Sequence, residues 1–120
     1  MQDLEALWSV EFLTPGQNNI NAGIVILETN RVFGGDSWYY YTGTYQGEDG
    51  KLAAQLKSTH YAGPVGSPSM SNRREGTYLF REIGRGQDQN GSGTIDVEGS
   101  IIEVPGAKVL ARLTWRANLP

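Results

Sequence analysis

The sequence predicts an all-β fold, a closed or nearly closed antiparallel barrel that forms a single domain over residues 1–120. Short runs of alternating apolar and polar residues follow one another, and no segment carries a sustained helical period. The chain also has 16 glycines without a collagen repeat, which indicates many tight turns and strand bends. Strands joined by hairpin signals favour a meander, and about eight strands can close into a barrel. The same pattern also fits a two-sheet sandwich.

The first part of the chain supplies three predicted strands. Residues 20–28 form a β-branched run in which Gly23 is expected to mark a bend or bulge. Residues 29–30 supply a tight turn, and 31–33 form a short return strand. Before these, residues 6–12 form a strand whose apolar face carries Trp8, Val10 and Phe12.

An aromatic strand is predicted over residues 37–46, after a hairpin at Gly34-Gly35-Asp36. Glycine accepts positive φ without strain, so Gly34 or Gly35 is expected to have that conformation. Bulky rings occupy both sides of the strand. One side has Trp38 and Tyr40, and the other has Tyr39, Tyr41 and Tyr45.

Two interpretations fit this two-sided strand. Aromatic side chains are frequent in strands, where they pack in a core or on an outer face. Tyr and Trp also combine apolar area with a polar group, which suits ligand cavities and association surfaces. Because a barrel strand has one inward face, we expect one set of rings to contact a ligand or a second subunit. Which side points inward stays open, since Gly43 can mark a bulge.

The middle of the chain continues with a turn at 47–50, where Glu48 and Asp49 lie between glycines. Residues 62–76 are rich in Gly, Pro and Ser, and a connection of this length is usually a functional loop, a lid or a disordered segment. Between the turn and this connection lies an alternating strand, whose inward side chains are Leu52, Ala54 and Leu56.

Three more strands are predicted in the last part of the chain. Residues 77–83 form the first, and a polar, Gly-rich loop follows at 84–93. Two clearly alternating strands then meet at a turn formed by Pro105-Gly106. Their inward side chains are Ile95, Val97, Ile101, Val109, Ala111, Leu113 and Trp115. The core positions predicted most firmly by alternation are Trp8, Leu56, Val97, Leu113 and Trp115.

Residues suited to catalysis or metal binding are few. The chain has no cysteine and one histidine, His60, so a thiolate site or a multi-histidine site cannot be built within it. A phosphate loop requires a glycine-rich segment followed by a helix, and no glycine-rich segment of this chain is followed by a predicted helix. The acidic residues considered for acid–base catalysis lie on turns or outward positions: Asp36, Glu48, Asp49, Asp96 and Glu98. The sequence therefore predicts a binding protein that is not an enzyme and has no metal or cofactor.

Charge and hydropathy limit the classes of partner that are expected. The net charge of −3 argues against direct nucleic-acid binding, which usually needs a basic face. No apolar run approaches the ~20 residues of a membrane helix, so no membrane span is expected. The acidic residues 1–5 do not resemble a signal peptide, and the expected location is the cytoplasm.

Three segments carry a resemblance to a known family: LWSVEF at 7–12, GIVI at 23–26 and RVFGGDSWYYYTGTY at 31–45. In this order they resemble the GrlR family of bacterial proteins, named for a negative regulator of type III secretion gene expression. The resemblance implies a lipocalin-like, eight-stranded barrel that forms a homodimer and has an apolar interior able to hold lipid-like molecules. The family prototype sequesters a helix-turn-helix transcriptional activator by protein–protein contact.

Two functions follow as expectations. In the first, the chain is a negative regulator, and Glu48 and Asp49 contact the activator, because they occupy the place of the prototype's longer acidic run. In the second, it is a carrier or sensor that holds a small apolar ligand or lipid in the barrel, with the aromatic strand lining the cavity.

Overall fold

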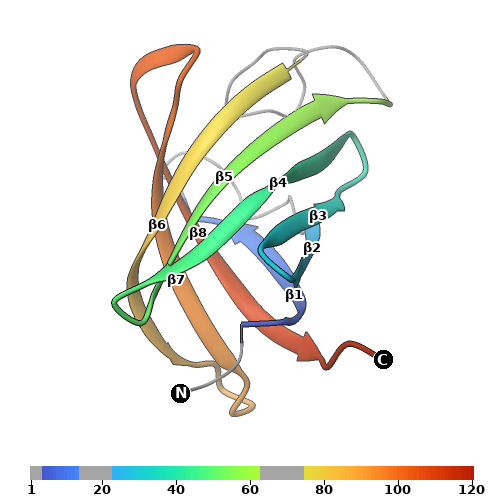
Figure 1. Ribbon diagram of the computed structural model, residues 1–120, viewed down its shortest axis with the longest axis vertical. Helices are drawn as coiled ribbons and strands as arrows, with labels where there is room; N and C mark the ends of the chain where they lie inside the picture. The colour runs from blue at the N-terminus through green and yellow to red at the C-terminus, as the bar shows by residue number, and fades with distance from the viewer. Residues whose placement is uncertain (1–3, 14–22, 63–74) are drawn as a thin grey trace.

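The computed structural model describes residues 4–13, 23–62 and 75–120 and shows a closed barrel of eight antiparallel strands (Figure 1). Each strand pairs with its neighbours in sequence, and β1 pairs with β8 to close the ring. The up-and-down barrel is therefore confirmed, and the two-sheet sandwich is excluded. The strands are β1 (Ala6–Phe12), β2 (Gly23–Glu28), β3 (Arg31–Gly35), β4 (Tyr39–Glu48), β5 (Lys51–His60), β6 (Glu75–Gln87), β7 (Gly93–Ile101) and β8 (Val104–Ala117).

Alternating side chains from the whole ring fill the barrel. The largest fully buried side chains are Trp8, Leu27 and Val109. The closing pair of strands places Trp8 opposite Trp115 and Val10 opposite Leu113. Of the residues predicted to be buried, Trp8, Val97 and Leu113 are buried. Leu56 and Trp115 are partly buried and pack against the core, so the facing predicted for these strands is correct.

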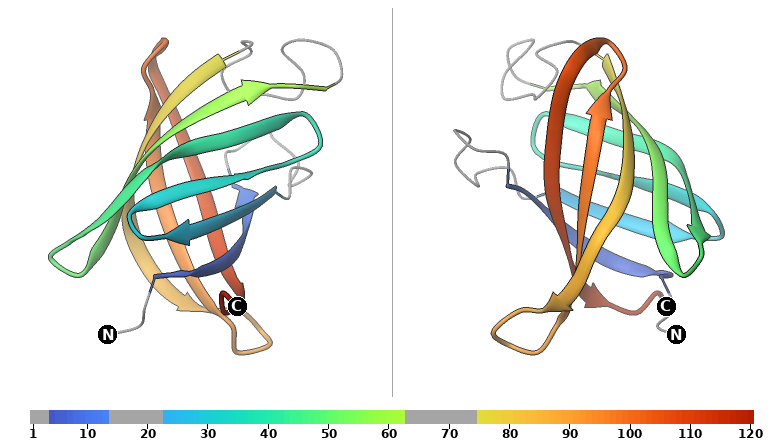
Figure 2. Two further views of the ribbon diagram at one scale, coloured as in Figure 1. Left: turned by 45° about the vertical axis from the view of Figure 1, so that its right-hand side comes forward. Right: turned by 90° about the vertical axis from the view of Figure 1, so that its left-hand side faces the viewer.

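The barrel has two ends with different connections (Figure 2). At the Asp36 end lie the β3–β4 turn at 36–38 and the β7–β8 turn at 102–103. The Glu82 end carries the β2–β3, β4–β5 and β6–β7 turns, and both ends of the described chain lie near it. Residues 63–74 of the predicted loop at 62–76 lie outside the described residues. So do residues 20–22 of the predicted strand at 20–28.

The predicted hairpin that leads into the aromatic strand is confirmed as β3–β4, but the position of its turn and the positive φ predicted for Gly34 or Gly35 are wrong. Both glycines belong to β3, neither has positive φ, and the chain turns after them at 36–38. Glycine at position 34 has a different reason. A Cβ there would lie 1.9 Å from the carbonyl oxygen of Ile24 on the paired strand, so the close approach of β2 and β3 requires a bare backbone.

Two boundaries in the last part of the chain also differ from prediction. The β7–β8 turn lies at 102–103, and Gly106 belongs to β8 with a φ of 86°. The predicted loop at 84–93 shortens to 88–92 because β6 continues to Gln87. A register shift between Glu82 and Gly84 breaks the alternation of β6, which explains why the sequence pattern ends early there.

Candidate functional site

The structure decides which side of the aromatic strand points inward. Tyr39, Tyr41 and Tyr45 are buried inside the barrel, whereas Tyr40 points outward and is 45% exposed. Trp38 lies in the β3–β4 turn and packs against the core from the barrel end. The aromatic set predicted as one site is therefore divided between the interior, the Asp36 end and the outer wall.

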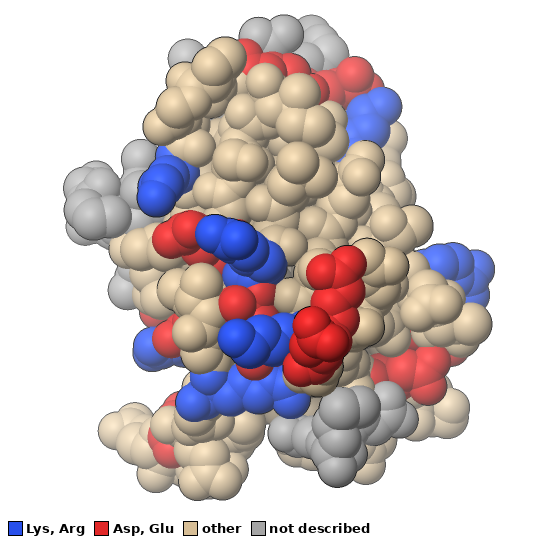
Figure 3. Space-filling model, turned by 60° about the vertical axis from the view of Figure 1, so that its left-hand side comes forward, with Lys and Arg blue, Asp and Glu red and all other residues tan. Residues whose placement is uncertain are grey.

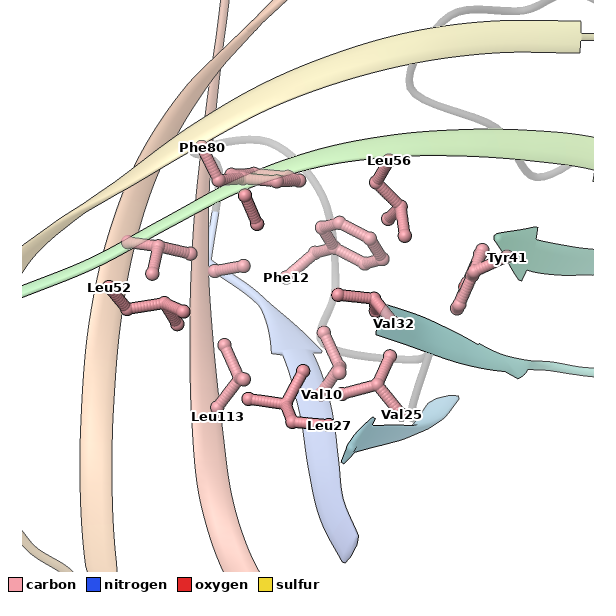
Figure 4. A pocket seen from close by; sticks show the side chains of 13 residues that line it. Val10, Phe12, Val25, Leu27, Val32, Tyr41, Leu52, Leu56, Phe80 and Leu113 are labelled. Atoms are coloured by element: carbon pink, nitrogen blue, oxygen red, sulfur yellow. The ribbon is translucent and has the colours of Figure 1, made fainter. Parts of the chain in front are cut away.

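Inside the barrel, an apolar cavity of about 60 Å³ lies between strands from all around the ring (Figure 4). Its wall includes the Tyr41 ring, Phe12, Leu56 and Phe80, and no charged side chain lines it. Ligand pockets usually measure about 300–1,000 Å³, and even a benzene-sized engineered cavity measures about 150 Å³. The interior is therefore mostly filled by its own side chains.

The Asp36 carboxylate is the main hydrogen-bond acceptor at the Asp36 end. Its Oδ1 accepts hydrogen bonds from the backbone N–H groups of Trp38 and Tyr39, each at 2.8 Å. Its Oδ2 accepts a hydrogen bond from the Tyr41 hydroxyl. Burial, together with the hydrogen bond to the Asp36 carboxylate, raises the pKa of Tyr41 far above its ordinary range. Tyr41 therefore stays a neutral donor, and Asp36 holds the turn that sequence reasoning treated only as a glycine hairpin.

Tyr61 joins this network from the end of β5. Its hydroxyl donates to the Asp36 carbonyl at 2.6 Å, and its backbone N–H donates to the Trp38 carbonyl at 2.9 Å. The Tyr61 ring lies 6.3 Å from the Tyr40 ring, between centroids. Tyr61 was not among the predicted site residues, because its 25-residue separation from Asp36 gives no local signal.

His60 lies beside Tyr39 at the same end of the barrel. The two rings meet edge to face, with their centroids 5.4 Å apart. The His60 Nε2 atom is buried and has no hydrogen-bond partner among the described residues. Within the described residues, no group of three His, Cys, Asp or Glu side chains could hold a metal ion.

The acidic turn lies at the Glu82 end. Glu48 and Asp49 are exposed at the tip of the β4–β5 hairpin, and Asp49 has a φ of 53°. Near its tip, the hairpin is joined to β6 by two further hydrogen bonds that involve side chains. The Leu52 N–H donates to Glu82 Oε1 at 2.8 Å, and Arg85 Nη2 donates to the Gly50 carbonyl at 3.1 Å.

Glu82 and Arg85 also form an ion pair, with Arg85 Nε 2.6 Å from Glu82 Oε2. The Glu82 side chain is only 6% exposed. Burial acts to raise the pKa of Glu82, but the hydrogen bonds from Arg85 and the Leu52 N–H outweigh it, so the pKa lies below its ordinary value. The ionised carboxylate therefore accepts the Leu52 N–H at the base of the acidic turn.

Acidic and basic side chains are interspersed over the outer wall of β5–β8 (Figure 3). Arg112 of β8 forms a two-pronged pair with Asp96 of β7, with Arg112 Nε 2.7 Å from Asp96 Oδ1. Looser pairs join Lys57 to Glu75 and Arg81 to Glu98. Strands β5–β8 together carry seven Lys or Arg residues and four Asp or Glu residues, so basic side chains outnumber acidic ones on this part of the barrel.

The fold and site define a closed β-barrel with a nearly filled interior, an acidic turn at one end and exposed rings on its outer wall. Among the described residues, no helix is long and apolar enough to cross a membrane. Comparison of the chain with protein-family models and with curated proteins gives no significant match.

Proposed function

We propose that the chain is a non-enzymatic regulatory binding protein, a GrlR-like homodimer that sequesters a transcriptional activator by protein–protein contact in the cytoplasm. The acidic turn of Glu48 and Asp49 contacts the activator. The observation that carries the proposal is that this exposed turn is fixed to β6 through Glu82 and Arg85. A turn held in one position loses less conformational entropy on binding than a loose one.

Charge supports the choice of partner. A transcriptional activator carries a basic DNA-binding surface, and an acidic turn is attracted to such a surface during encounter. Among the described residues, Glu48 accepts one side-chain hydrogen bond, from Gln46 Nε2 at 2.5 Å, on the exposed hairpin. The carboxylates of the turn therefore remain accessible to basic side chains.

The test is affinity capture of a helix-turn-helix activator from the same cell, followed by titration at two salt concentrations. The double variant Glu48→Gln/Asp49→Asn should bind about tenfold more weakly at low salt, and the difference should shrink as salt rises. The matched control, Glu75→Gln/Glu98→Gln, removes two charges from the β5–β8 wall and should bind like the parent. Equal affinity of both double variants would contradict the assignment of the turn.

A carrier or sensor of a small apolar ligand is the second candidate, and the apolar cavity beside Tyr41 is the observation that favours it. A volume of about 60 Å³ fits only a fragment of a lipid unless side chains move aside. Mass spectrometry of the native protein separates the candidates. Retained lipid would favour the carrier, and a bare dimer mass would favour the regulator.

A further inference from the structure

The β6–β7 turn contains a chemically labile pair of residues. Asn90 is followed by Gly91, whereas every other asparagine of the chain is followed by a residue that carries a side chain. The backbone nitrogen that follows an asparagine can attack the side-chain carbonyl carbon of that asparagine. Glycine favours the attack, because it has no Cβ to block the approach and its backbone adopts many conformations.

The structure leaves this pair open to water. The turn at 88–92 projects from the Glu82 end of the barrel (Figure 2). Asn90 and Gly91 are both exposed, and a Cβ at Gly91 would meet nothing within 4 Å. The Asn90 backbone N–H is hydrogen-bonded, but no described residue bonds its side-chain amide. No packing contact of the side-chain amide therefore has to be broken before it reacts.

Hydrogen bonds within the turn oppose the attack. Asp88 Oδ1 accepts hydrogen bonds from the backbone N–H groups of Asn90 and Ser92, each at 2.9 Å. The N–H of Gly91 donates to the Asp88 carbonyl at 3.0 Å. The Gly91 nitrogen must lose this proton before it can attack, so the turn has to open first. Opening is local, because these bonds join residues of one exposed turn.

We propose that Asn90 is a site of spontaneous deamidation and that the Asp88 carboxylate slows the reaction by holding the turn closed. The Gly91 nitrogen forms a bond to the Asn90 side-chain carbonyl carbon, and the bond from that carbon to the side-chain nitrogen breaks. The proton lost by the Gly91 nitrogen is returned to the leaving amino group, which departs as ammonia. One water molecule then opens the cyclic imide at either of its two carbonyl carbons, to give aspartate or isoaspartate.

Both products change the turn. Each adds one carboxylate, so the net charge of −3 becomes one unit more negative. Isoaspartate also adds one carbon to the main chain between residues 90 and 91. The hydrogen bonds that close the turn join positions spaced for an ordinary peptide, so the longer main chain cannot keep all of them. The new charge lies at the same end of the barrel as the acidic β4–β5 turn.

The experiment is warm incubation of the purified chain at neutral and at mildly alkaline pH, followed by peptide mass mapping. Asn90 should be converted at least about tenfold faster than Asn118, which is also exposed but precedes Leu119. Conversion should be faster at the higher pH, because the attacking nitrogen must lose a proton. Asn90→Gln should abolish the charge variant, because its longer side chain has to close a larger ring. If Asn90 is converted no faster than Asn118 in the folded chain, the site is overturned.

A second comparison tests the role of Asp88, with circular dichroism as the check of folding. Asp88→Ala removes the acceptor of two N–H groups and should speed the conversion of Asn90 at least about threefold. Asp88→Asn removes the charge but keeps an acceptor oxygen, and it should react more slowly than Asp88→Ala. Glu98→Gln is the matched control, because it removes an acid outside the turn and should react like the parent.

Two outcomes would overturn the role of Asp88. The first is an Asp88→Ala variant that is converted no faster than the parent or the Glu98→Gln control. The second is equal acceleration in Asp88→Asn and Asp88→Ala, which would assign the effect to charge alone and not to the hydrogen bonds.

Discussion

The two ends of the barrel are each held by one carboxylate, but the carboxylates have different partners. At one end, Asp36 accepts hydrogen bonds from two backbone N–H groups and from the neutral Tyr41 hydroxyl. At the other, Glu82 accepts a hydrogen bond from the Leu52 N–H and forms an ion pair with Arg85. A carboxylate can thus hold a barrel end either as the acceptor of a tight turn or as half of an ion pair.

The two ends also differ in how closely neighbouring backbones approach the glycines. On the strands that lead to Asp36, a Cβ at Gly34 would collide with the backbone of β2. Towards the other end, a Cβ at Gly47 or Gly84 would meet nothing within 4 Å. The Asp36 end therefore depends on close backbone geometry, whereas the Glu82 end depends on charge. Substitutions at the two ends should respond differently to side-chain size and to pH.

The largest loss of stability is expected for a substitution in the barrel interior. Leu113→Ala removes a buried side chain that lines the apolar cavity, so the lost contacts add to an existing void. We expect the free energy of unfolding to fall by about 3–4 kcal/mol in urea denaturation. Leu79→Ala, on the outer wall, should cost less than about 1 kcal/mol. A loss below about 0.5 kcal/mol for Leu113→Ala would mean that its facing is wrong.

Asp36→Ala should cost about 3 kcal/mol, because it leaves two backbone N–H groups and the Tyr41 hydroxyl without their acceptor. Asp36→Asn keeps one acceptor oxygen and should cost less. The comparison variant is Asp96→Ala, which removes an acid from a partly exposed ion pair and should cost at most about 1 kcal/mol. If Asp36→Ala and Asp96→Ala unfold at the same urea concentration, the Asp36 network is not holding its end.

Gly34→Ala should destabilise the fold by about 2 kcal/mol, since the added methyl group collides with the Ile24 carbonyl and neither backbone can move freely. Gly47→Ala adds the same methyl group in open space and should change stability by less than about 0.5 kcal/mol. Thermal melting of the pair measures the difference directly. Identical melting temperatures would remove the distinction in crowding between the two ends.

The smallest expected effect, about 1 kcal/mol, concerns Glu82 and appears as a dependence on pH. The pKa of Glu82 is lower in the folded chain than its unfolded value of about 4.3. Its contribution to stability is therefore present above the unfolded pKa and is lost as pH falls through the folded pKa. Urea denaturation of Glu82→Gln should consequently show a shallower loss of stability below about pH 4 than the parent. Parallel pH curves would contradict this role of the ion pair.

Much of the fold could be predicted from local alternation. The facing of Trp8 and Leu113 follows from a period of two, because successive side chains of a strand point to opposite faces. The strand order follows from hairpin signals at short spacing. Prediction failed where alternation is interrupted, as at the register shift after Glu82, and where glycine serves close packing instead of a turn, as at Gly34.

The candidate sites were predicted less completely. The sequence by itself determined that Tyr39 and Tyr40 point to opposite sides, but only the closed ring decided that Tyr39 points inward. The network of Asp36 and Tyr61 and the contact of Leu52 with Glu82 also belong to the tertiary structure, because 25 and 30 residues separate their members. Local sequence determines which side chains share a face of a strand. Which distant side chains share a barrel end depends on strand length and register around the whole ring, and these are decided only when the barrel closes.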